Sequence, residues 1–139
     1  MTKSPIPELA NIEKLVPSIA AAAEEIEQSR GLPNQVVAAL KEAGVFRALL
    51  PHNFGGLEAY FPDYIRLVQA IAQADASTAW CVNQAAVIGL TSLWLPPDST
   101  HKIWADLNTS VANGPPFDCA IAQSERGYVL NGHWGFSSG

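Results

Sequence analysis

The chain has 139 residues, of which 48% are hydrophobic and 15% are charged, and its formal net charge at pH 7 is −5. This length and composition fit one globular domain with a real core and exclude a disordered chain. The acidic balance and the scattered Lys and Arg residues argue against nucleic acids and anionic membranes as partners.

The cysteines and the N-terminus indicate where the protein is expected to reside. Cys81 and Cys119 lie in apolar runs, without a Cys-x-x-Cys pattern or a histidine at partner spacing. They are expected to be buried free thiols in a reducing compartment. The first eight residues contain no apolar segment of the kind that a secretion signal needs. The expected location is therefore cytoplasmic.

Residues 76–97 contain no charged residue and are long enough to cross a bilayer. However, Asn83 and Gln84 lie in the middle of this stretch, and unpaired amides are costly in hydrocarbon. We therefore expect a helix buried in protein, and no contact with a membrane.

The first helical segment has apolar residues at intervals of three and four, and Gly31 is its expected C-cap. Pro17 lies inside this segment and predicts either a kink or a division into two helices. A second, short helix is expected from Pro33 to Gly44. The apolar positions of the two segments are Leu9, Ile12, Val16, Ile19, Ala23, Ile26, Val36, Val37 and Leu40.

The next segment connects these helices to a second group. Residues 45–51 are expected to run extended into the loop 52–56, whose paired glycines allow left-handed backbone angles or a close backbone approach. A third helix opens at Pro62. Asp75 is expected to cap a fourth helix, about residues 76–93, which is apolar on nearly every side and should be the most enclosed.

One face of this fourth helix is the candidate ligand-binding face. Trp80, Asn83, Gln84 and Val87 follow each other at steps of three and four residues, so they share one side of the helix. This face could meet a ligand. Alternatively, Trp80 belongs to the core and the two amides bond to neighbouring backbone or helices.

A fifth, short helix begins near Pro96, and the composition after Asp106 is typical of strands. Strands are expected at residues 109–114 and 119–123, followed by a turn at 124–127 and a hairpin that folds back at Asn131-Gly132. A boundary near residue 108 divides the chain into a helical domain (1–108) and the start of a β domain (109–139). The expected fold is mainly α, with about five helices before the first antiparallel strands.

Several common catalytic classes find no support in the sequence. No His, Cys, Asp and Glu cluster has metal-ligand spacing, so no metal site is expected. The Gly-x-Ser-x-Gly elbow of serine hydrolases is absent. The glycine-rich motifs that bind dinucleotides or phosphates are also absent.

The last stretch of the chain resembles a known flavin-binding element. Tyr128-Val129-Leu130-Asn131-Gly132, followed by an aromatic residue and Ser-Ser-Gly, is similar to the flavin-facing hairpin of the acyl-CoA dehydrogenase superfamily. Within it, Trp134-Gly135-Phe136-Ser137-Ser138-Gly139 resembles the Trp-x-Phe-(Ala/Ser)-Ser-Gly ending found in oxygenase components of two-component flavin monooxygenases. The chain departs from the dehydrogenases at Trp134 and Phe136, so the resemblance favours the oxygenase branch.

Two other stretches carry the same resemblance. Residues 32–56 are similar to a helix ending in Ala-Gly and a following Pro-x-x-(Phe/Tyr)-Gly-Gly turn. Residues 75–80 match the Asp-x-Ser-x-x-Trp pattern that opens the helix lining the flavin and substrate pocket in the oxygenases. Several of those oxygenases have a histidine two turns later, where this chain has Val87 and Ile88.

The resemblance implies roles for particular residues. It implies that Trp134 and Phe136 wall a flavin ring and that Ser137 and Ser138 donate hydrogen bonds to it, with Ser138 near N5 as the catalytic hydroxyl. It implies that Asn113 faces the flavin. Trp80 and Gln84 would then contact the substrate. The flavin itself supplies the electron transfer, and the protein sets its orientation and surroundings.

The resemblance also implies a function for the chain as part of a larger protein. The expected function is the N-terminal portion of a monooxygenase that hydroxylates a small hydrophobic or aromatic substrate with O2 and reduced FMN or FAD from a separate flavin reductase. The family habit is a homotetramer. Two alternatives stay open: an acyl-CoA dehydrogenase acting on a thioester, and a truncated helical module that binds a partner without catalysis. The chain alone is expected to be catalytically incomplete.

Overall fold

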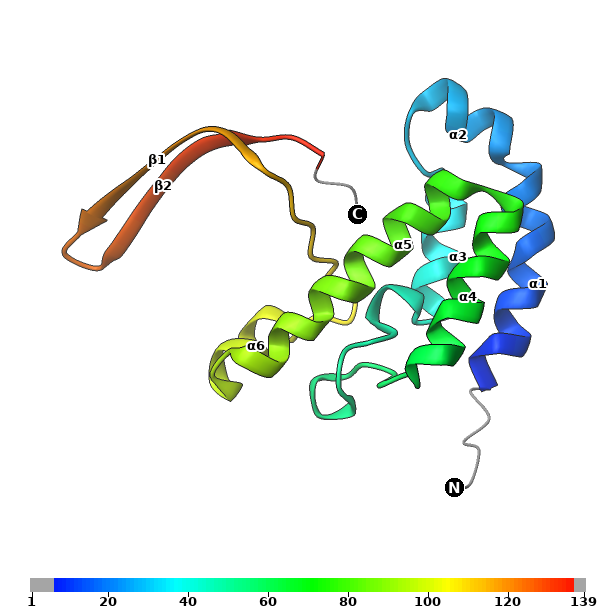
Figure 1. Cartoon of the computed structure of the whole chain (residues 1–139), viewed down its shortest axis with the longest axis horizontal. Coiled ribbons are helices and arrows are strands. Elements are labelled where there is room, and N and C mark those ends of the chain that lie inside the picture. Colours follow the sequence, from blue (N-terminus) through cyan, green and yellow to red (C-terminus); the bar gives the residue numbers. More distant parts are fainter. Residues whose placement is uncertain (1–6, 137–139) are drawn as a thin grey trace.

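The computed structural model describes residues 7–136, which form a helical bundle followed by one β-hairpin (Figure 1). The mainly α fold with a first antiparallel strand pair is therefore confirmed. The helices are α1 (Pro7–Ala21), α2 (Ala23–Ser29), α3 (Asn34–Glu42), α4 (Phe61–Ala74), α5 (Ala76–Gly89) and α6 (Pro97–Ile103). Short 3-10 turns are η1 (Val45–Arg47), η2 (His52–Phe54) and η3 (Leu90–Trp94), and the strands are β1 (Pro116–Ser124) and β2 (Gly127–Trp134).

The core of the molecule lies between α1, α3, α4 and α5. Each of these helices places an apolar stripe toward the others, as its three- and four-residue periodicity predicts. Burial of these side chains is the main favourable contribution to folding. Fully buried residues of this core include Ile12, Ile19, Leu40, Leu67, Ile71 and Val82.

The predicted division of the first segment is confirmed, but its position is different. Pro17 lies inside α1, and the break falls at Ala22, whose N–H bonds to the carbonyls of Ser18 and Ile19. One missing backbone bond at a proline is tolerated where the helix packs on the core. The helix α2 ends at Ser29, and its C-cap is Arg30, which has a φ of 54°. The C-cap prediction for Gly31 was therefore wrong by one residue.

Residues 45–51 are compact and not extended, contrary to the prediction. Gly44 has a φ of 72°, and η1 follows it with backbone bonds from Arg47 to Gly44 and from Ala48 to Val45. Residues 45–50 are all buried, and tight turns bury six consecutive residues while their backbone groups stay paired.

The paired glycines have the two roles predicted for them. Gly55 has a φ of 78°, and a Cβ at Gly56 would collide with the carbonyl oxygen of Leu50.

The segment 45–56 is tied to the end of α6 by a buried arginine. The Arg47 guanidinium donates to the carbonyls of Phe54 and Trp104 at 2.8 Å each, and to that of Asp106 at 3.3 Å. Burial lowers the pKa of Arg47, while the nearby Asp106 carboxylate acts in the opposite direction. These bonds fix Phe46, the neighbour of Arg47, beside α5.

The prediction that α5 is the most enclosed helix agrees with burial in the described part of the chain, where α5 has six buried residues and α4 has three, but one side of α5 is open. One side buries Val82, Ala85 and Ala86 in the core, but Trp80 and Val87 on another side are exposed. In Figure 1, this helix lies at the front of the bundle, between α4 and the hairpin. Its start is as predicted, because the Asp75 carboxylate accepts a 2.6 Å bond from the Thr78 N–H.

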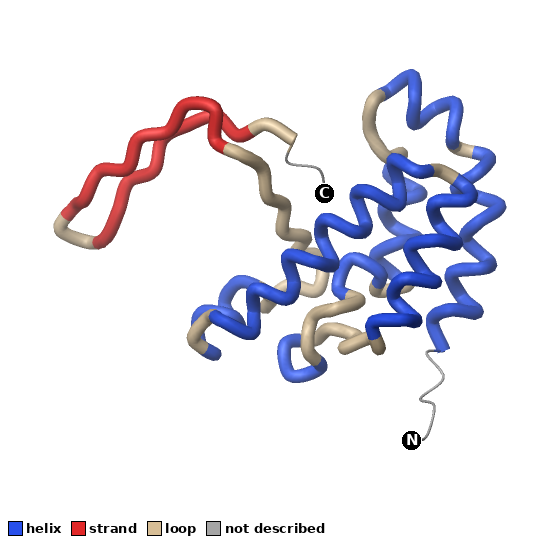
Figure 2. The backbone as a smooth tube through the Cα atoms, viewed as in Figure 1, coloured by secondary structure: helices blue, strands red, loops and turns tan. Residues whose placement is uncertain are grey.

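The hairpin turns at Glu125 and Arg126, and not at Asn131-Gly132 (Figure 2). Asn131 and Gly132 are paired inside β2 with Ala120 and Cys119. Gly127, with a φ of 135°, supplies the backbone freedom that the turn needs. Residues 109–114, predicted as a strand, are irregular, because β1 begins only at Pro116.

The hairpin exposes both of its faces. In an antiparallel pair, residues directly opposite each other point to the same side. Cys119, Ile121, Tyr128 and Leu130 therefore share a mainly apolar face with Gln123, and the other, more mixed face carries Asp118, Ala120, Ala122, Val129, Asn131 and His133.

The two cysteines are free, as expected, but neither is fully buried. Cys81 is half-buried and Cys119 is exposed on the hairpin. Within residues 7–136, none of the helices combines the length and the hydropathy that a membrane crossing requires.

Candidate functional site

The first part of the candidate site is the outer side of α5. Trp80 is 55% exposed, Val87 is exposed, and Asn83 and Gln84 are half-buried. The predicted face therefore exists, and its tryptophan is not a core residue. A large aromatic ring and an amide lie here on a rigid helix, where a flat ligand could stack and find a hydrogen bond.

Asn83 is held from behind by a buried tyrosine of α4. The Tyr64 hydroxyl donates a 2.7 Å hydrogen bond to Asn83 Oδ1, and the tyrosine ring is almost fully buried. Burial raises the pKa of Tyr64 to about 12, so the hydroxyl stays protonated and acts as a donor at neutral pH. For Asn83 the second of the two possibilities therefore holds: its amide bonds to a neighbouring helix and joins α4 to α5.

The second part of the candidate site is the open end of the hairpin. Trp134 is 42% exposed and Phe136 is 79% exposed, and Phe136 meets Phe117 edge to face with ring centroids 6.2 Å apart. A Cβ at Gly135 would collide with the outer atoms of the Phe117 ring, so this ring would have to move if a larger residue replaced the glycine. Ser137 and Ser138, the predicted flavin donors, lie outside the described residues.

The predicted site residues do not form one cluster in residues 7–136. Asn113 lies exposed in the irregular segment before β1. No hydrogen bond or ring contact in this part of the chain joins Trp80 or Gln84 to Asn113, Trp134 or Phe136. The hairpin extends away from the bundle, with its open end nearer to α5 than its tip (Figure 1).

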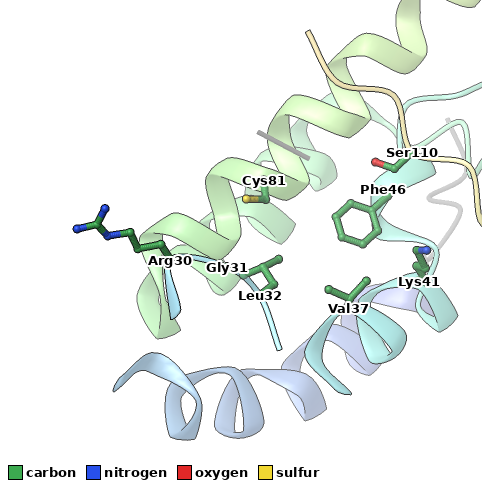
Figure 3. Close-up of a pocket in the computed structure, with 8 residues that line it drawn as sticks. All are labelled: Arg30, Gly31, Leu32, Val37, Lys41, Phe46, Cys81 and Ser110. Atoms are coloured by element: carbon green, nitrogen blue, oxygen red, sulfur yellow. The ribbon is translucent and has the colours of Figure 1, made fainter. Parts of the chain in front are cut away.

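A pocket beside α5 was not predicted from the sequence. Its volume is about 440 Å³, and it lies between α3, η1, α5, the connection from α2 to α3 and the segment after α6 (Figure 3). Because it unites five separate segments, no local pattern could have revealed it. The lining residues are Arg30, Gly31, Leu32, Val37, Lys41, Phe46, Cys81 and Ser110.

Cys81 is the pocket residue that α5 contributes. It follows Trp80 directly and lies three residues before Gln84, so the pocket adjoins the predicted ligand face. Burial raises the pKa of the Cys81 thiol, and the Asp75 carboxylate one and a half turns away raises it further. The thiol is thus neutral at pH 7. Among residues 7–136, no group of His, Cys, Asp and Glu is arranged to hold a metal ion.

Comparison with known families identifies the class of the fold. Residues 13–95 match the family described as acyl-CoA dehydrogenase, N-terminal domain, which is more than half of the chain. The chain therefore belongs to this family. This confirms the resemblance that the sequence motifs indicated.

The similar curated proteins are oxygenases. The chain is 34% identical over 136 residues to the p-hydroxyphenylacetate 3-hydroxylase, oxygenase component, of Acinetobacter baumannii, which covers 94% of this chain and 31% of that protein. It is 31% identical over 119 residues to the indole-3-acetate monooxygenase of Pseudomonas putida, covering 83% of this chain and 30% of that protein.

Solved structures agree on the fold. The 3-HSA hydroxylase from Rhodococcus sp. RHA1 superposes with a TM-score of 0.84 at 27% identity, covering 94% of this chain and 34% of that one. XiaF from Streptomyces sp., solved in complex with FADH2 and glycerol, superposes with a TM-score of 0.86 at 21% identity and covers 94% of this chain and 33% of that one. The chain thus spans about a third of the length of these relatives.

The described residues fit a flavin in part. The aromatic rings at the open end of the hairpin are uncovered, as stacking against a flat ring system requires. The hydroxyl donors that would orient the flavin are Ser137 and Ser138, beyond the described residues. The fit therefore rests on Trp134, Phe136 and the exposed side of α5.

Proposed function

We propose that this chain provides the helical wall and the first hairpin of the flavin site in the oxygenase component of a two-component monooxygenase. Such a protein hydroxylates a small aromatic substrate with O2 and a reduced flavin supplied by a separate reductase. The observation that carries the proposal is the alignment of 94% of the chain with a p-hydroxyphenylacetate hydroxylase at 34% identity. The indole-3-acetate monooxygenase, similar along 83% of the chain, supports an aromatic substrate.

The proposed roles of the residues follow the sequence motifs. Trp134 and Phe136 would wall the flavin, Ser137 would donate a hydrogen bond to it, and Ser138 would donate to N5. Asn113, in the segment before β1, would be a further flavin contact. Trp80 and Gln84 on α5 would contact the substrate. When bound, the flavin, FMN or FAD, supplies the oxidation chemistry, and these residues bind it, orient it and exclude water.

Flavin retention by the purified protein tests the proposal. Reduced FMN or FAD is added without oxygen, the mixture is passed through a gel-filtration column, and flavin absorbance in the protein fraction is measured after air is admitted. We expect retention that is stronger for reduced than for oxidised flavin. If p-hydroxyphenylacetate and O2 are also present, a hydroxylated product is expected from the whole oxygenase component, and not from this chain alone. Loss of all flavin on the column would contradict the proposal.

Two other outcomes correspond to different functions. Bleaching of a retained oxidised flavin by an acyl-CoA thioester would identify an acyl-CoA dehydrogenase. A non-catalytic interaction module has one observation in its favour, because the hairpin exposes Ile121, Tyr128 and Leu130 on a single face. Such a module would retain no flavin and would bind a partner through that face. The homotetramer, the reductase partner and the cytoplasmic location belong to the same proposal.

A further inference from the structure

The pocket beside α5 has the size and walls of a small-molecule site. Its volume of about 440 Å³ lies within the range of roughly 300–1,000 Å³ that is common for ligand pockets. Leu32, Val37 and Phe46 give it apolar walls, and Cys81 and Ser110 add small polar atoms (Figure 3). A ring with a short side chain would fill such a space.

The charges around the pocket are of one sign. Arg30 and Lys41 line it, and no carboxylate does, although the chain as a whole has a net charge of −5. In Figure 3 the Arg30 guanidinium points away from the other lining side chains, whereas Lys41 lies beside Phe46 and Ser110. The same three residues, Lys41, Phe46 and Ser110, also line a small neighbouring crevice, so they are close together.

Lys41 is available for a ligand. Within residues 7–136 the ion pair is between Arg66 and Asp63, and Lys41 has no carboxylate partner. Its position in the last turn of α3 places the ammonium at the rim of the apolar pocket, next to the Phe46 ring. A cation at the edge of an apolar slot selects a ligand that has a ring at one end and an anion at the other.

We propose that this pocket binds an aromatic carboxylate, with the ring between Leu32, Val37 and Phe46 and the carboxylate paired with Lys41. Ser110 donates a second hydrogen bond to the acid group, and Cys81 lies against the ring. The inference rests on the proposed function for the role of the ligand, which is the substrate to be hydroxylated. The substrate would then lie on the side of α5 that carries Cys81, the residue next to Trp80.

Cys81 makes the proposal testable at the level of the site. In a Cys119→Ser background Cys81 is the single thiol, and its rate of modification by a small aromatic disulfide reagent reports whether the pocket is open. The probe is phenylacetate, and the matched neutral ligand is phenylacetamide. We expect phenylacetate at about ten times its dissociation constant to slow the modification about tenfold, because the occupied fraction is closed to the reagent.

Two lysine variants separate the pocket from general charge effects. Lys41→Met keeps the apolar stem and removes the charge, and we expect it to raise the phenylacetate dissociation constant about fivefold, the size of a partly exposed ion pair. Lys102→Met, on the exposed side of α6 and away from the pocket, should leave the constant unchanged. Phenylacetamide should protect Cys81 equally in the unsubstituted protein and in Lys41→Met.

The outcomes distinguish this inference from the proposed function. If phenylacetate gives no protection, or if Lys41→Met and Lys102→Met behave alike, the aromatic-acid pocket is wrong. Flavin retention, measured separately, does not depend on either lysine. Retention without protection would therefore leave the proposed function in place and remove the pocket as the substrate site.

Discussion

Asp75 starts α5 and thereby sets the register of the face that carries Trp80 and Gln84. Its carboxylate accepts bonds from the Ser77 hydroxyl at 2.7 Å and the Thr78 N–H at 2.6 Å. Partial burial alone would raise the pKa of Asp75, but these hydrogen bonds outweigh it and hold the pKa below its ordinary value of 3.8. The ionised side chain is therefore the form that stabilises the helix.

We expect Asp75→Ala to lower the free energy of unfolding by about 1 kcal/mol at pH 7, because the cap is lost. Asp75→Asn keeps an acceptor oxygen and should lose only part of this. Because the folded-state pKa is depressed, the contribution of the charge is present above about pH 3.8 and disappears as the pH falls below it. Urea denaturation at pH 7 and pH 3 measures both effects. Equal losses in the two variants would contradict a hydrogen-bonding cap.

Tyr64 connects α4 to α5 because its hydroxyl donates to Asn83 Oδ1 at 2.7 Å and lies 3.5 Å from the Asn83 carbonyl oxygen, and its ionisation should be visible in stability. The folded-state pKa is about 12, against 10.0 for an unperturbed tyrosine. A raised pKa means that the contribution is complete below about pH 10 and is lost as the pH rises through 12. We expect the free energy of unfolding to fall by about 2–3 kcal/mol over this range from this residue alone.

The matched variant is Tyr64→Phe, which keeps the ring in the core and removes the hydroxyl. It should cost about 1 kcal/mol at pH 7, the net value of one hydrogen bond. Above pH 10, its stability should fall less steeply than that of the unsubstituted protein. Denaturation curves at pH 7, 10 and 12 give the comparison, and parallel pH profiles would show that Tyr64 does not titrate in this range.

At the scale of elements, Arg47 joins three pieces of chain: its own turn η1, η2 and the segment just after α6. Its guanidinium bonds to carbonyls of η2 and of the residues just after α6, and one of its nitrogens, Nε, has no partner. Phe46, next to it, forms part of the pocket wall. The position of the pocket wall therefore depends on Arg47, although Arg47 does not line the pocket.

We expect Arg47→Met to lower the free energy of unfolding by about 3 kcal/mol, because three carbonyls lose a charged donor in a buried place. The matched control is Arg66→Met on α4. That arginine is 66% exposed in its pair with Asp63, so its removal should cost no more than about 0.5 kcal/mol. Thermal and urea unfolding measure both variants. A similar small loss in each would show that the Arg47 contacts contribute little.

For the molecule as a whole, the features predicted from sequence are those that local chemistry decides. The helix start at Asp75 and the left-handed backbone at Gly55 follow from side-chain oxygens and missing Cβ atoms, and both are confirmed. Residues 45–50 were not predictable, because a short apolar run looks the same whether it is a strand or a buried set of turns. Asn131-Gly132 has the composition of a turn, but pairing with β1 placed the turn at Glu125-Arg126.

The candidate site likewise has parts that local sequence predicts and parts that it does not. The shared side of Trp80, Gln84 and Val87 follows from helical spacing alone, and the structure has it. The exposure of that side does not follow, because it depends on which neighbours cover an apolar helix. The pocket with Lys41, Phe46 and Ser110 depends on contacts between segments about 70 residues apart in the chain, which no spacing rule describes.

The hairpin exposes large apolar side chains on one of its faces. Ile121 and Leu130 are directly paired on its apolar face, and both are more than half exposed. An uncovered apolar face on a two-stranded ribbon with open edges favours association with other chains. We therefore expect the protein to self-associate through this face as its concentration rises.

A pair of double variants tests this expectation. Ile121→Lys with Leu130→Glu places opposite charges on the apolar face and keeps the cross-strand pair attractive. Ala120→Lys with Asn131→Glu makes the same change at the adjacent pair on the other face. Because burial of each large aliphatic side chain contributes about 1.5–3 kcal/mol, the first variant should weaken self-association more than about tenfold, and the second should change it little. Sedimentation velocity over a range of concentrations measures the association constants. Circular dichroism confirms that the helices stay intact, and equal behaviour of the two variants would mean that the apolar face is not the contact surface.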